Sequence, residues 1–348
     1  DIPNKDIDIE IHGIKPEILK NILSELGDIQ TIGNAFGIYN LKGYDLDIAL
    51  PRKERCIGTG HKDFEVYVDP YIGTHAAARR RDFTINTLCM DSNKNIIDLL
   101  NGRVDIDNKL IRTVGDSVEK FSEDALRILR AVRFATILNF NLTPEVYDAI
   151  IKTKKYLSNI SYNRKKDELD KIFMSPNAKH GIELIKRLGL DSSLEIYNID
   201  EIKLSTDLVG IWSSLNVSPN YPFTKAEKEL MDKIKEAAPL DNYDRRVLYK
   251  YGPYVNRVAA INKGLDENVV VNVYNSLPIK AKGDINISAK KIMEILSMPP
   301  GKYLNKIYID LENKIIDGLL VNDSKNIESY IINNYRGKLW KKTKWLTY

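Results

Sequence analysis

The chain opens with short segments in which apolar and polar residues alternate, and this pattern constrains the fold more than any other feature of the sequence. A period of two is typical of β-strands with one buried face. The segments are IDIEIHG, FGIYNLKG, YDLDIAL and FEVYVD. Between the first two, KPEILKNILSELG has the apolar spacing of a helix that ends at Gly27. The sequence therefore predicts mixed α and β structure up to about residue 115.

From about residue 116 the pattern becomes that of helices. SEDALRILRAVRFATILNF repeats apolar residues at helical spacing, and LTPEVYDAIIKTKKYL carries Pro144 near its start, where a helix accepts proline. Helical segments with short breaks continue to the end of the chain. We therefore predict an α+β protein, with a small mixed β-sheet in an N-terminal head and an all-helical remainder.

Composition narrows the class of protein. With 348 residues, 43% of them hydrophobic and 29% charged, the chain should be soluble and form two or more domains. A net charge of +4 fits a local basic surface but does not by itself imply nucleic acid. The two cysteines lack metal-binding spacing, which favours a reducing compartment. No apolar run of membrane-spanning length or signal peptide is visible, so we expect a cytoplasmic protein without a membrane partner.

Carboxylates stand side by side in the first predicted strand. Residues i and i+2 of a strand point the same way, so Asp6 and Asp8 of KDIDIE project from one face. Two adjacent carboxylates repel one another unless a cation neutralises them, and oxygen ligands of this kind suit Mg²⁺. The alternative is an edge strand with solvated acids. YDLDIALPR repeats the pattern with Asp45 and Asp47, which could instead be polar positions of a half-buried strand.

An arginine-rich segment follows the last predicted strand of the head. AAARRRDFTINTL contains Arg79, Arg80 and Arg81, followed by Asp82 and Asn86. Arginine binds phosphate oxygens in a two-pronged fashion, as a nucleoside triphosphate beside Mg²⁺ would require. A solvated basic turn is the alternative interpretation.

RRDFTIN resembles the signature of class II tRNA nucleotidyltransferases, the CCA-adding enzymes, and of their bacterial poly(A) polymerase relatives. KDIDIE is similar to the end of that family's first motif, and DIALPR to its second, which singles out Asp47 as the third carboxylate. EDALRILRAVRF resembles the EDxxR nucleotide-reading motif. SYNRKKDELDKIF resembles the last motif, with Arg164 and Glu168 at the expected spacing but Asn163 in place of an acid. The glycine pair and Arg-Asp of the first motif are not in this sequence.

The resemblance implies an enzyme that adds CCA to the 3′ end of tRNA from CTP and ATP and releases pyrophosphate. It implies a catalytic head (1–115), a nucleotide-recognising neck (116–178), a body (179–268) and a tail that binds the acceptor arm (269–348). The catalytic residues and Mg²⁺ ligands it implies are Asp6, Asp8 and Asp47. The nucleotide-binding residues it implies are Arg80, Arg81, Asp82, Asn86, Asp124, Arg127, Arg130 and Arg133.

Asp124 and Arg127 are candidates for reading the base. On one helix, residues i and i+3 share a face. A carboxylate accepts a hydrogen bond from the exocyclic amino group of C or A, whereas U and G present a carbonyl oxygen there. Arg127 would donate to a ring nitrogen that accepts in both C and A. A salt-bridged helix surface is the alternative for these residues.

Other features leave alternatives open. The glycine-containing segment 52–62 fits the flexible loop that the family uses when it changes from C to A addition, or a plain surface connection. Trp212, Tyr249, Tyr251 and Tyr254, and KLWKKTKWLTY at the end of the chain, have residue types that suit RNA contact. Enzymes that add CC, A or poly(A) share this chemistry, while an inactive RNA-binding relative or a small-molecule nucleotidyltransferase is a more distant possibility.

Overall fold

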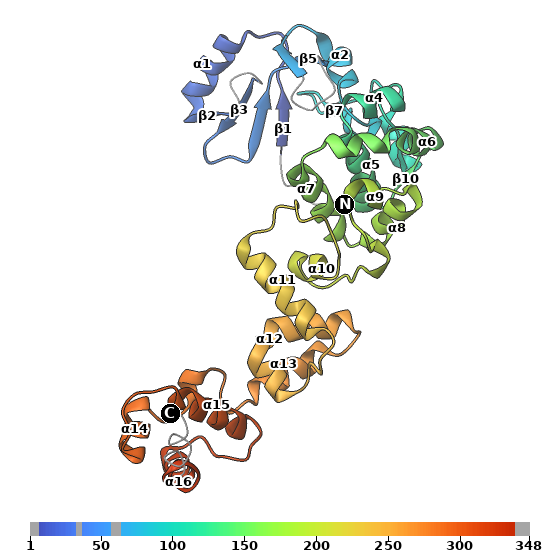
Figure 1. Ribbon diagram of the computed structural model, residues 1–348. Coiled ribbons are helices and arrows are strands. Elements are labelled where there is room, and N and C mark those ends of the chain that lie inside the picture. Colours follow the sequence, from blue (N-terminus) through green and yellow to red (C-terminus); the bar gives the residue numbers. More distant parts are fainter. Residues whose placement is uncertain (1–6, 33–36, 57–63, 338–348) are drawn as a thin grey trace, which may run out of the picture. The chain divides into compact units, whose positions relative to one another are not determined.

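The computed structural model describes residues 7–32, 37–56 and 64–337 (Figure 1), so Asp6 lies outside the described residues. The chain divides into two compact units, one of Asp1–Asp200 with Asn216–Pro222 and the other of Glu201–Leu215 with Phe223–Tyr348. We describe each unit separately. The finer division into head, neck, body and tail stays a prediction.

A small mixed sheet forms the head, as the alternating segments predict. Its spatial order is β1-β4-β3-β2, with β1 parallel to β4 and the other pairs antiparallel. The strands are β1 (Ile7–Glu10), β2 (Ile29–Ile32), β3 (Ile38–Leu41) and β4 (Leu46–Ala49). Helix α1 (Pro16–Leu26) connects β1 to β2 and ends before Gly27, as predicted.

The sheet has one covered face and one open face. Leu19 and Leu23 of α1 pack on Tyr39 and Ile48, which are paired residues of β3 and β4. Because successive side chains of a strand alternate, the neighbours of these residues point to the opposite face. Strand β1 lies at one end of the sheet order and Ile7 is 54% exposed, so β1 is an edge strand and is not buried on both faces.

The polar segment after β4 contains a strand that the sequence did not reveal. Arg52–Cys56 forms β5 and pairs antiparallel with β6 (Phe64–Val68), so the first part of the predicted loop 52–62 is extended strand. Residues 57–62 of that loop lie outside the described residues. Helix α2 (Gly73–Arg79) then leads into the arginine-rich segment.

Short elements connect the head to the helices of the first unit. A turn of 3₁₀ helix at Thr84–Asn86 lies within RRDFTIN. The remaining short elements are β7 (Cys89–Met90), β8 (Ile96–Ile97), α3 (Gly102–Asp107), β9 (Leu110–Ile111) and β10 (Asn141–Leu142). β7 pairs with β8, and β9 pairs with β10.

Helices build the rest of the first unit. They are α4 (Ser117–Glu123), α5 (Leu126–Leu138), α6 (Pro144–Thr153), α7 (Tyr162–Phe173), α8 (Ala178–Leu188) and α9 (Asp191–Leu194), with a 3₁₀ helix at Lys154–Asn159. As predicted, α6 begins at Pro144, and Thr143 caps it by accepting from the Val146 amide. Leu129 and Val132 of α5 are fully buried. This buried stripe holds α5 between α7 and α8 and fixes which of its residues face outward.

The second unit is helical throughout its described part. Its helices are α10 (Leu208–Ser213), α11 (Lys225–Ala237), α12 (Arg245–Asn262), α13 (Glu267–Asn275), α14 (Ala289–Leu296), α15 (Tyr303–Ile316) and α16 (Ser324–Tyr335). Helix α12 is kinked at Gly252, whose φ of 77° is left-handed, directly before Pro253. None of the helices in the described residues is long and apolar enough to span a membrane.

Candidate active site

Asp8 and Asp47 lie opposite one another on neighbouring parallel strands. The register pairs Asp8 of β1 with Asp47 of β4, and both side chains are exposed. Ile48 points into the core, so Asp47 and its partner Asp8 point to the open face of the sheet. Adjacent strands are about 4.8 Å apart, which brings the two carboxylates within reach of one cation.

The carboxylate pair therefore fits a divalent cation, although the described residues do not complete a cage. Within 7–32, 37–56 and 64–337, no group of three or more His, Cys, Asp or Glu residues is placed to hold a metal ion. Asp6, the other predicted ligand, is outside those ranges. Asp45 is exposed and directly precedes β4.

Asn40 orients Asp47, a role that the sequence analysis missed. It lies opposite Asp47 in the β3–β4 register, and its Nδ2 donates to Asp47 Oδ1 at 2.6 Å. One carboxylate oxygen of Asp47 is thereby engaged, which fixes the direction of the other. The available signal was the place of Asn40 in FGIYNLKG, where it is polar between two core positions of the strand.

The arginine-rich segment lies beside the same strand. Arg80 Nη2 donates to Glu10 Oε2 at 2.9 Å, and Arg81 Nη2 is 3.7 Å from the same oxygen. Glu10 is the last residue of β1, two positions after Asp8, so its side chain points to the same face. The structure thus brings the predicted phosphate-binding arginines close to the strand that carries Asp8.

Asp82 and Asn86 face α5. Arg130 Nε donates to Asp82 Oδ2 at 2.6 Å, and Asn86 Nδ2 donates to Asp82 Oδ1 at 2.9 Å. Burial alone raises the pKa of Asp82, but Arg130 and the hydrogen bonds outweigh it and hold that pKa below its usual value. These three predicted nucleotide-binding residues therefore also bind one another, and their contact with a nucleotide stays a prediction.

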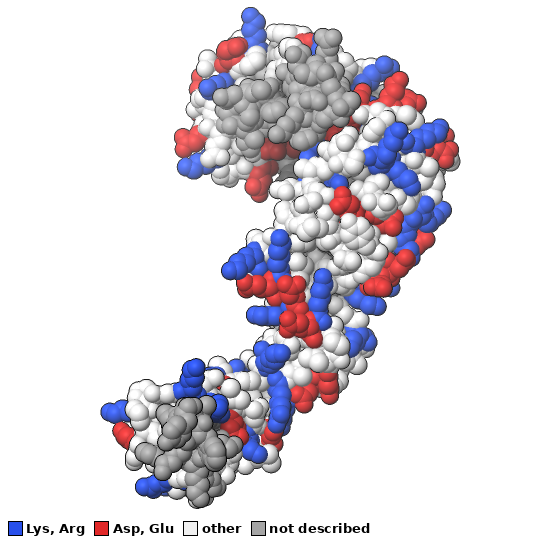
Figure 2. Space-filling view, in the orientation of Figure 1, with Lys and Arg blue, Asp and Glu red and all other residues white. Residues whose placement is uncertain are grey.

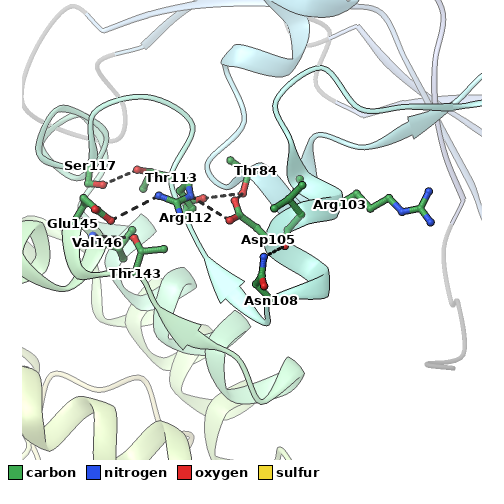
Figure 3. Close-up of polar contacts among 12 residues, drawn as sticks. Thr84, Arg103, Asp105, Asn108, Arg112, Thr113, Ser117, Thr143, Glu145 and Val146 are labelled. Carbon is green, nitrogen blue, oxygen red and sulfur yellow. Dashed lines mark hydrogen bonds and ion pairs between the residues drawn. The ribbon is translucent and has the colours of Figure 1, made fainter.

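A second carboxylate, that of Asp105 in α3, is hydrogen-bonded to RRDFTIN (Figure 3). Thr84 Oγ1 donates to Asp105 Oδ2 at 2.6 Å, and Arg112 Nε donates to Asp105 Oδ1 at 3.2 Å. A cavity of about 320 Å³ lies beside Arg112, lined in part by Thr113 and Ser117. Those two hydroxyls bond each other at 2.7 Å, so both already have a partner within the protein. Sequence analysis did not find this support.

Asp124 and Arg127 do not share a helix, and the predicted geometry is wrong here. Asp124 has extended φ and ψ values of −142° and 104° and separates α4 from α5. Its Oδ1 accepts from the Leu126 amide at 3.0 Å, so it caps the first amide of α5 from outside the helix. A carboxylate at such a position satisfies an amide that the helix leaves free.

The two predicted base-reading residues have different partners. Asp124 Oδ2 accepts from Arg164 Nη2 at 3.0 Å, whereas Arg127 Nη1 donates to Glu123 Oε2 at 2.6 Å and to the Lys120 carbonyl at 3.0 Å. Both side chains lie near the start of α5, Asp124 two residues before the helix and Arg127 in its first turn. The structure brings them to one end of α5, where the Arg127 amide donates to the Asp124 carbonyl at 3.0 Å, and none of the described side-chain hydrogen bonds or ion pairs joins the two residues.

Helix α7 supplies the counter-charges of this region. Arg164, at the start of the predicted last motif, pairs with Asp124, and Glu168 lies 2.6 Å from Arg133. Burial holds the pKa of the Arg133 guanidinium below its usual value, although the Glu168 carboxylate partly offsets this effect. Asn163, which replaces the family's acid, is exposed and does not prevent Arg164 from reaching Asp124.

The aromatic residues proposed for RNA contact in the second unit are largely structural. Trp212 is buried and packs edge-on against Phe223. Tyr249 donates to Glu312 Oε1 at 2.7 Å, and Tyr254 donates to Asp207 Oδ1 at 2.9 Å. The lysine- and tryptophan-containing segment 338–348 lies outside the described residues. Figure 2 shows basic and acidic side chains interleaved over α11, which is a solvated surface of mixed charge.

Family profiles match the chain over three ranges. The "Poly A polymerase head domain" matches residues 1–112, and the "Probable RNA and SrmB- binding site of polymerase A" matches residues 139–194. A tRNA nucleotidyltransferase domain 2 profile matches residues 229–331. The first range contains the carboxylate pair and the arginine-rich segment.

Solved structures share the fold. A Bacillus stearothermophilus CCA-adding enzyme in complex with CTP aligns with a TM-score of 0.81 at 22% identity, over 98% of this chain and 91% of that one. A Thermotoga maritima CCA-adding enzyme complexed with tRNA aligns with a TM-score of 0.67 at 19% identity, over 95% and 87%. At these identities the likeness shows the fold.

Sequence relatives settle the family. The CCA-adding enzyme of Bacillus subtilis (strain 168) is 32% identical in an alignment of 283 positions that covers 73% of this chain and 71% of that protein. The CCA-adding enzyme of Ligilactobacillus salivarius (strain UCC118) is 32% identical in an alignment of 283 positions that covers 71% of this chain and 69% of that protein. This chain therefore belongs to the CCA-adding enzyme family of nucleotidyltransferases.

Proposed function

We propose that this protein is a tRNA nucleotidyltransferase that adds CCA to the 3′ end of tRNA from CTP and ATP. The observation that carries the proposal is the register of Asp8 with Asp47 on the open face of the sheet, in a chain of this family. A cytoplasmic location, where such a protein meets tRNA, is part of the same proposal.

The reaction is a nucleotidyl transfer. The 3′-hydroxyl oxygen of tRNA forms a bond to the α-phosphorus of CTP or ATP, the bond from that phosphorus to the bridging oxygen breaks, and pyrophosphate leaves. Positioning and charge neutralisation supply most of the catalysis in such transfers. Arg81 is our candidate for binding the phosphates, and its support is that its side chain is 40% exposed beside the strand of Asp8.

Enzymes of this family use a divalent metal ion, and we infer that it is Mg²⁺ here. Asp8 and Asp47 would hold it, with Asp6 as a further proposed ligand that lies outside the described residues. When bound, such an ion lowers the pKa of the attacking hydroxyl and offsets the charge of the departing pyrophosphate.

Asp124 and Arg127 are proposed to read the base. A carboxylate offers about four acceptor sites, so Asp124 can accept from an exocyclic amino group while it keeps Arg164. Arg127 has five N–H donors, and its described contacts run through Nη1. The partners seen here fix both side chains and leave hydrogen-bonding capacity for C or A.

The proposal is tested by supplying tRNAs that lack CCA, CA or the final A, each with CTP or ATP alone and with both, and sequencing the products. We expect each tRNA to be extended to the same CCA end and no further. A single-nucleotide specificity would identify an enzyme that adds CC or A. An extended run of A would identify a poly(A) polymerase, the activity that two of the matching family descriptions name.

A tRNA contact by the second unit is a separate part of the proposal. The described surface of α11 mixes both signs of charge and does not by itself indicate RNA binding. The support for this contact is therefore the family membership. Tight binding of tRNA should weaken with rising salt if phosphates are contacted. Measuring tRNA affinity at two salt concentrations, for the full chain and for residues 1–337, tests whether the basic end segment takes part.

A further inference from the structure

Glu10 holds two sequence motifs together. Its Oε2 accepts from Arg80 Nη2 at 2.9 Å, and its Oε1 lies 3.0 Å from His12 Nε2. Arg80 is 70 residues further along the chain, in RRDFTIN. Glu10 therefore connects the strand of Asp8 to the arginine-rich segment.

The two arginines near Glu10 are held differently. The Arg80 side chain is 17% exposed and makes a direct hydrogen bond, whereas Arg81 is 40% exposed and lies 3.7 Å from the carboxylate, beyond hydrogen-bond length. Arg80 is thus committed to a direct contact within the protein, whereas Arg81 is more exposed and is held less closely by the carboxylate.

The electrostatic setting explains why Arg80 needs this carboxylate. Burial and the like charges of Arg81 and Arg52 lower the pKa of the Arg80 guanidinium, and Glu10 raises it. Three positive side chains would repel one another without a carboxylate among them. Removing Glu10 would leave a largely buried cation without this compensation.

We propose that Glu10 is a positioning residue: it holds Arg80 as an internal brace and thereby presents Arg81 to the phosphates of the incoming nucleotide. The identity of that nucleotide rests on the proposed function. Glu10 itself contacts neither base nor phosphate in this scheme.

Positioning and simple charge effects predict opposite outcomes for Glu10→Gln. Neutralising a carboxylate beside three arginines should tighten the binding of a triphosphate if only long-range charge matters. If Glu10 positions the segment, binding should weaken about tenfold, the size expected for losing a charge-assisted hydrogen bond. The sign of the change therefore decides between the two.

The experiment measures the dissociation constants of CTP, ATP and inorganic tripolyphosphate by calorimetry on the full chain, in Ca²⁺ and without tRNA. We expect Glu10→Gln to weaken all three to a similar degree, because tripolyphosphate has no base to read. In an Arg80→Ala background the same change should have no further effect. Arg81→Ala should weaken tripolyphosphate more than Arg80→Lys does.

Unchanged or tighter binding in Glu10→Gln, or an undiminished effect of that change in the Arg80→Ala background, would overturn the proposal. Asp200→Asn is a matched control, because it removes a carboxylate that pairs with Lys186 elsewhere in the unit. Thermal unfolding of each variant separates loss of fold from loss of binding. Arg80→Lys keeps the positive charge and tests whether the guanidinium hydrogen bond to Glu10 is needed. These readouts need no turnover, so a wild-type protein that fails to extend tRNA would refute the proposed function without deciding this one.

Discussion

Asp47 lies directly opposite Asp8 across two neighbouring parallel strands, and both side chains point away from the core of the head. The two residues are far apart in sequence, yet the β1–β4 register leaves one strand spacing between them. This relationship gives the head its negative site, and Asn40 fixes the direction of one of its carboxylates.

Replacing either carboxylate should remove catalysis. We expect Asp8→Ala and Asp47→Ala to lower the rate of CMP incorporation by more than about 100-fold, because residues that only orient metal ligands already cost 10–100-fold. Binding of tRNA should be largely kept, as measured by gel shift. The control is Asp45→Asn, an exposed acid just before the same strand. Appreciable turnover in Asp47→Ala would contradict the assignment.

Losing the amide that orients Asp47 should weaken cation binding. We expect Asn40→Ala to raise the dissociation constant of Mn²⁺, measured by electron paramagnetic resonance, by about tenfold. The control is Gln30→Ala, since Gln30 is the exposed partner of Asn40 in the β2–β3 register and makes no described contact with Asp47. Equal effects of the two substitutions would show that Asn40 has no special role.

Base selectivity should depend on Arg127. We expect Arg127→Ala to raise UTP and GTP incorporation relative to CTP by roughly tenfold or more, since a good bidentate contact provides about 1–3 kcal/mol of discrimination. Glu123→Gln removes the ion-pair partner of Arg127 and keeps the arginine, so it should change selectivity much less. Unchanged selectivity in Arg127→Ala would mean that the base is read elsewhere.

The Arg133–Glu168 pair should contribute to stability more than to chemistry. Its side chains are 13% and 7% exposed, so Glu168→Ala leaves a nearly buried cation and should cost about 3 kcal/mol. The measurement is the midpoint of thermal unfolding. The double replacement Arg133→Met with Glu168→Leu should be less destabilising than Glu168→Ala, because no unpaired charge remains. A larger loss in the double variant would contradict this account.

Acid should weaken the link between RRDFTIN and α5. The folded state holds the pKa of Asp82 below its unfolded value, so its stabilising effect is present above the unfolded pKa and is lost as the pH falls through the lower folded pKa. We expect Asp82→Asn to lower the free energy of unfolding near neutral pH and to flatten its decline in acid. The measurement is urea unfolding at a series of pH values from neutral to acid. A parallel decline in both proteins would show that Asp82 is not the titrating group.

Local pattern predicted the elements of the fold. The alternating segments around Ile7, Tyr39 and Ile48 became strands, and KPEILKNILSELG became α1, because the period of apolar residues reflects which face must be buried. Motif spacing also singled out Asp47 as a candidate ligand, and the structure places it opposite Asp8. β5 was missed because the charged residues of Arg52–Cys56 give no apolar alternation.

The break between α4 and α5 shows why periodicity alone misplaces a site residue. Apolar spacing continues through SEDALRILRAVRF, so the sequence predicted one helix, whereas Asp124 is extended and caps α5. An Asp before an apolar run is a helix-start signal that was available in the sequence. The break moves Asp124 off the helix face of Arg127 and toward Arg164 of α7.

The sequence by itself determined where carboxylates and arginines stand along the strands and helices, because strand and helix periods are local properties of the chain. Only the tertiary structure decided their partners: Glu10 with Arg80, Asp82 with Arg130, and Asp124 with Arg164. These residues are 70, 48 and 40 positions apart. Such pairs form when the burial of apolar faces brings distant segments together, and the geometry of that packing selects which charge lies beside which.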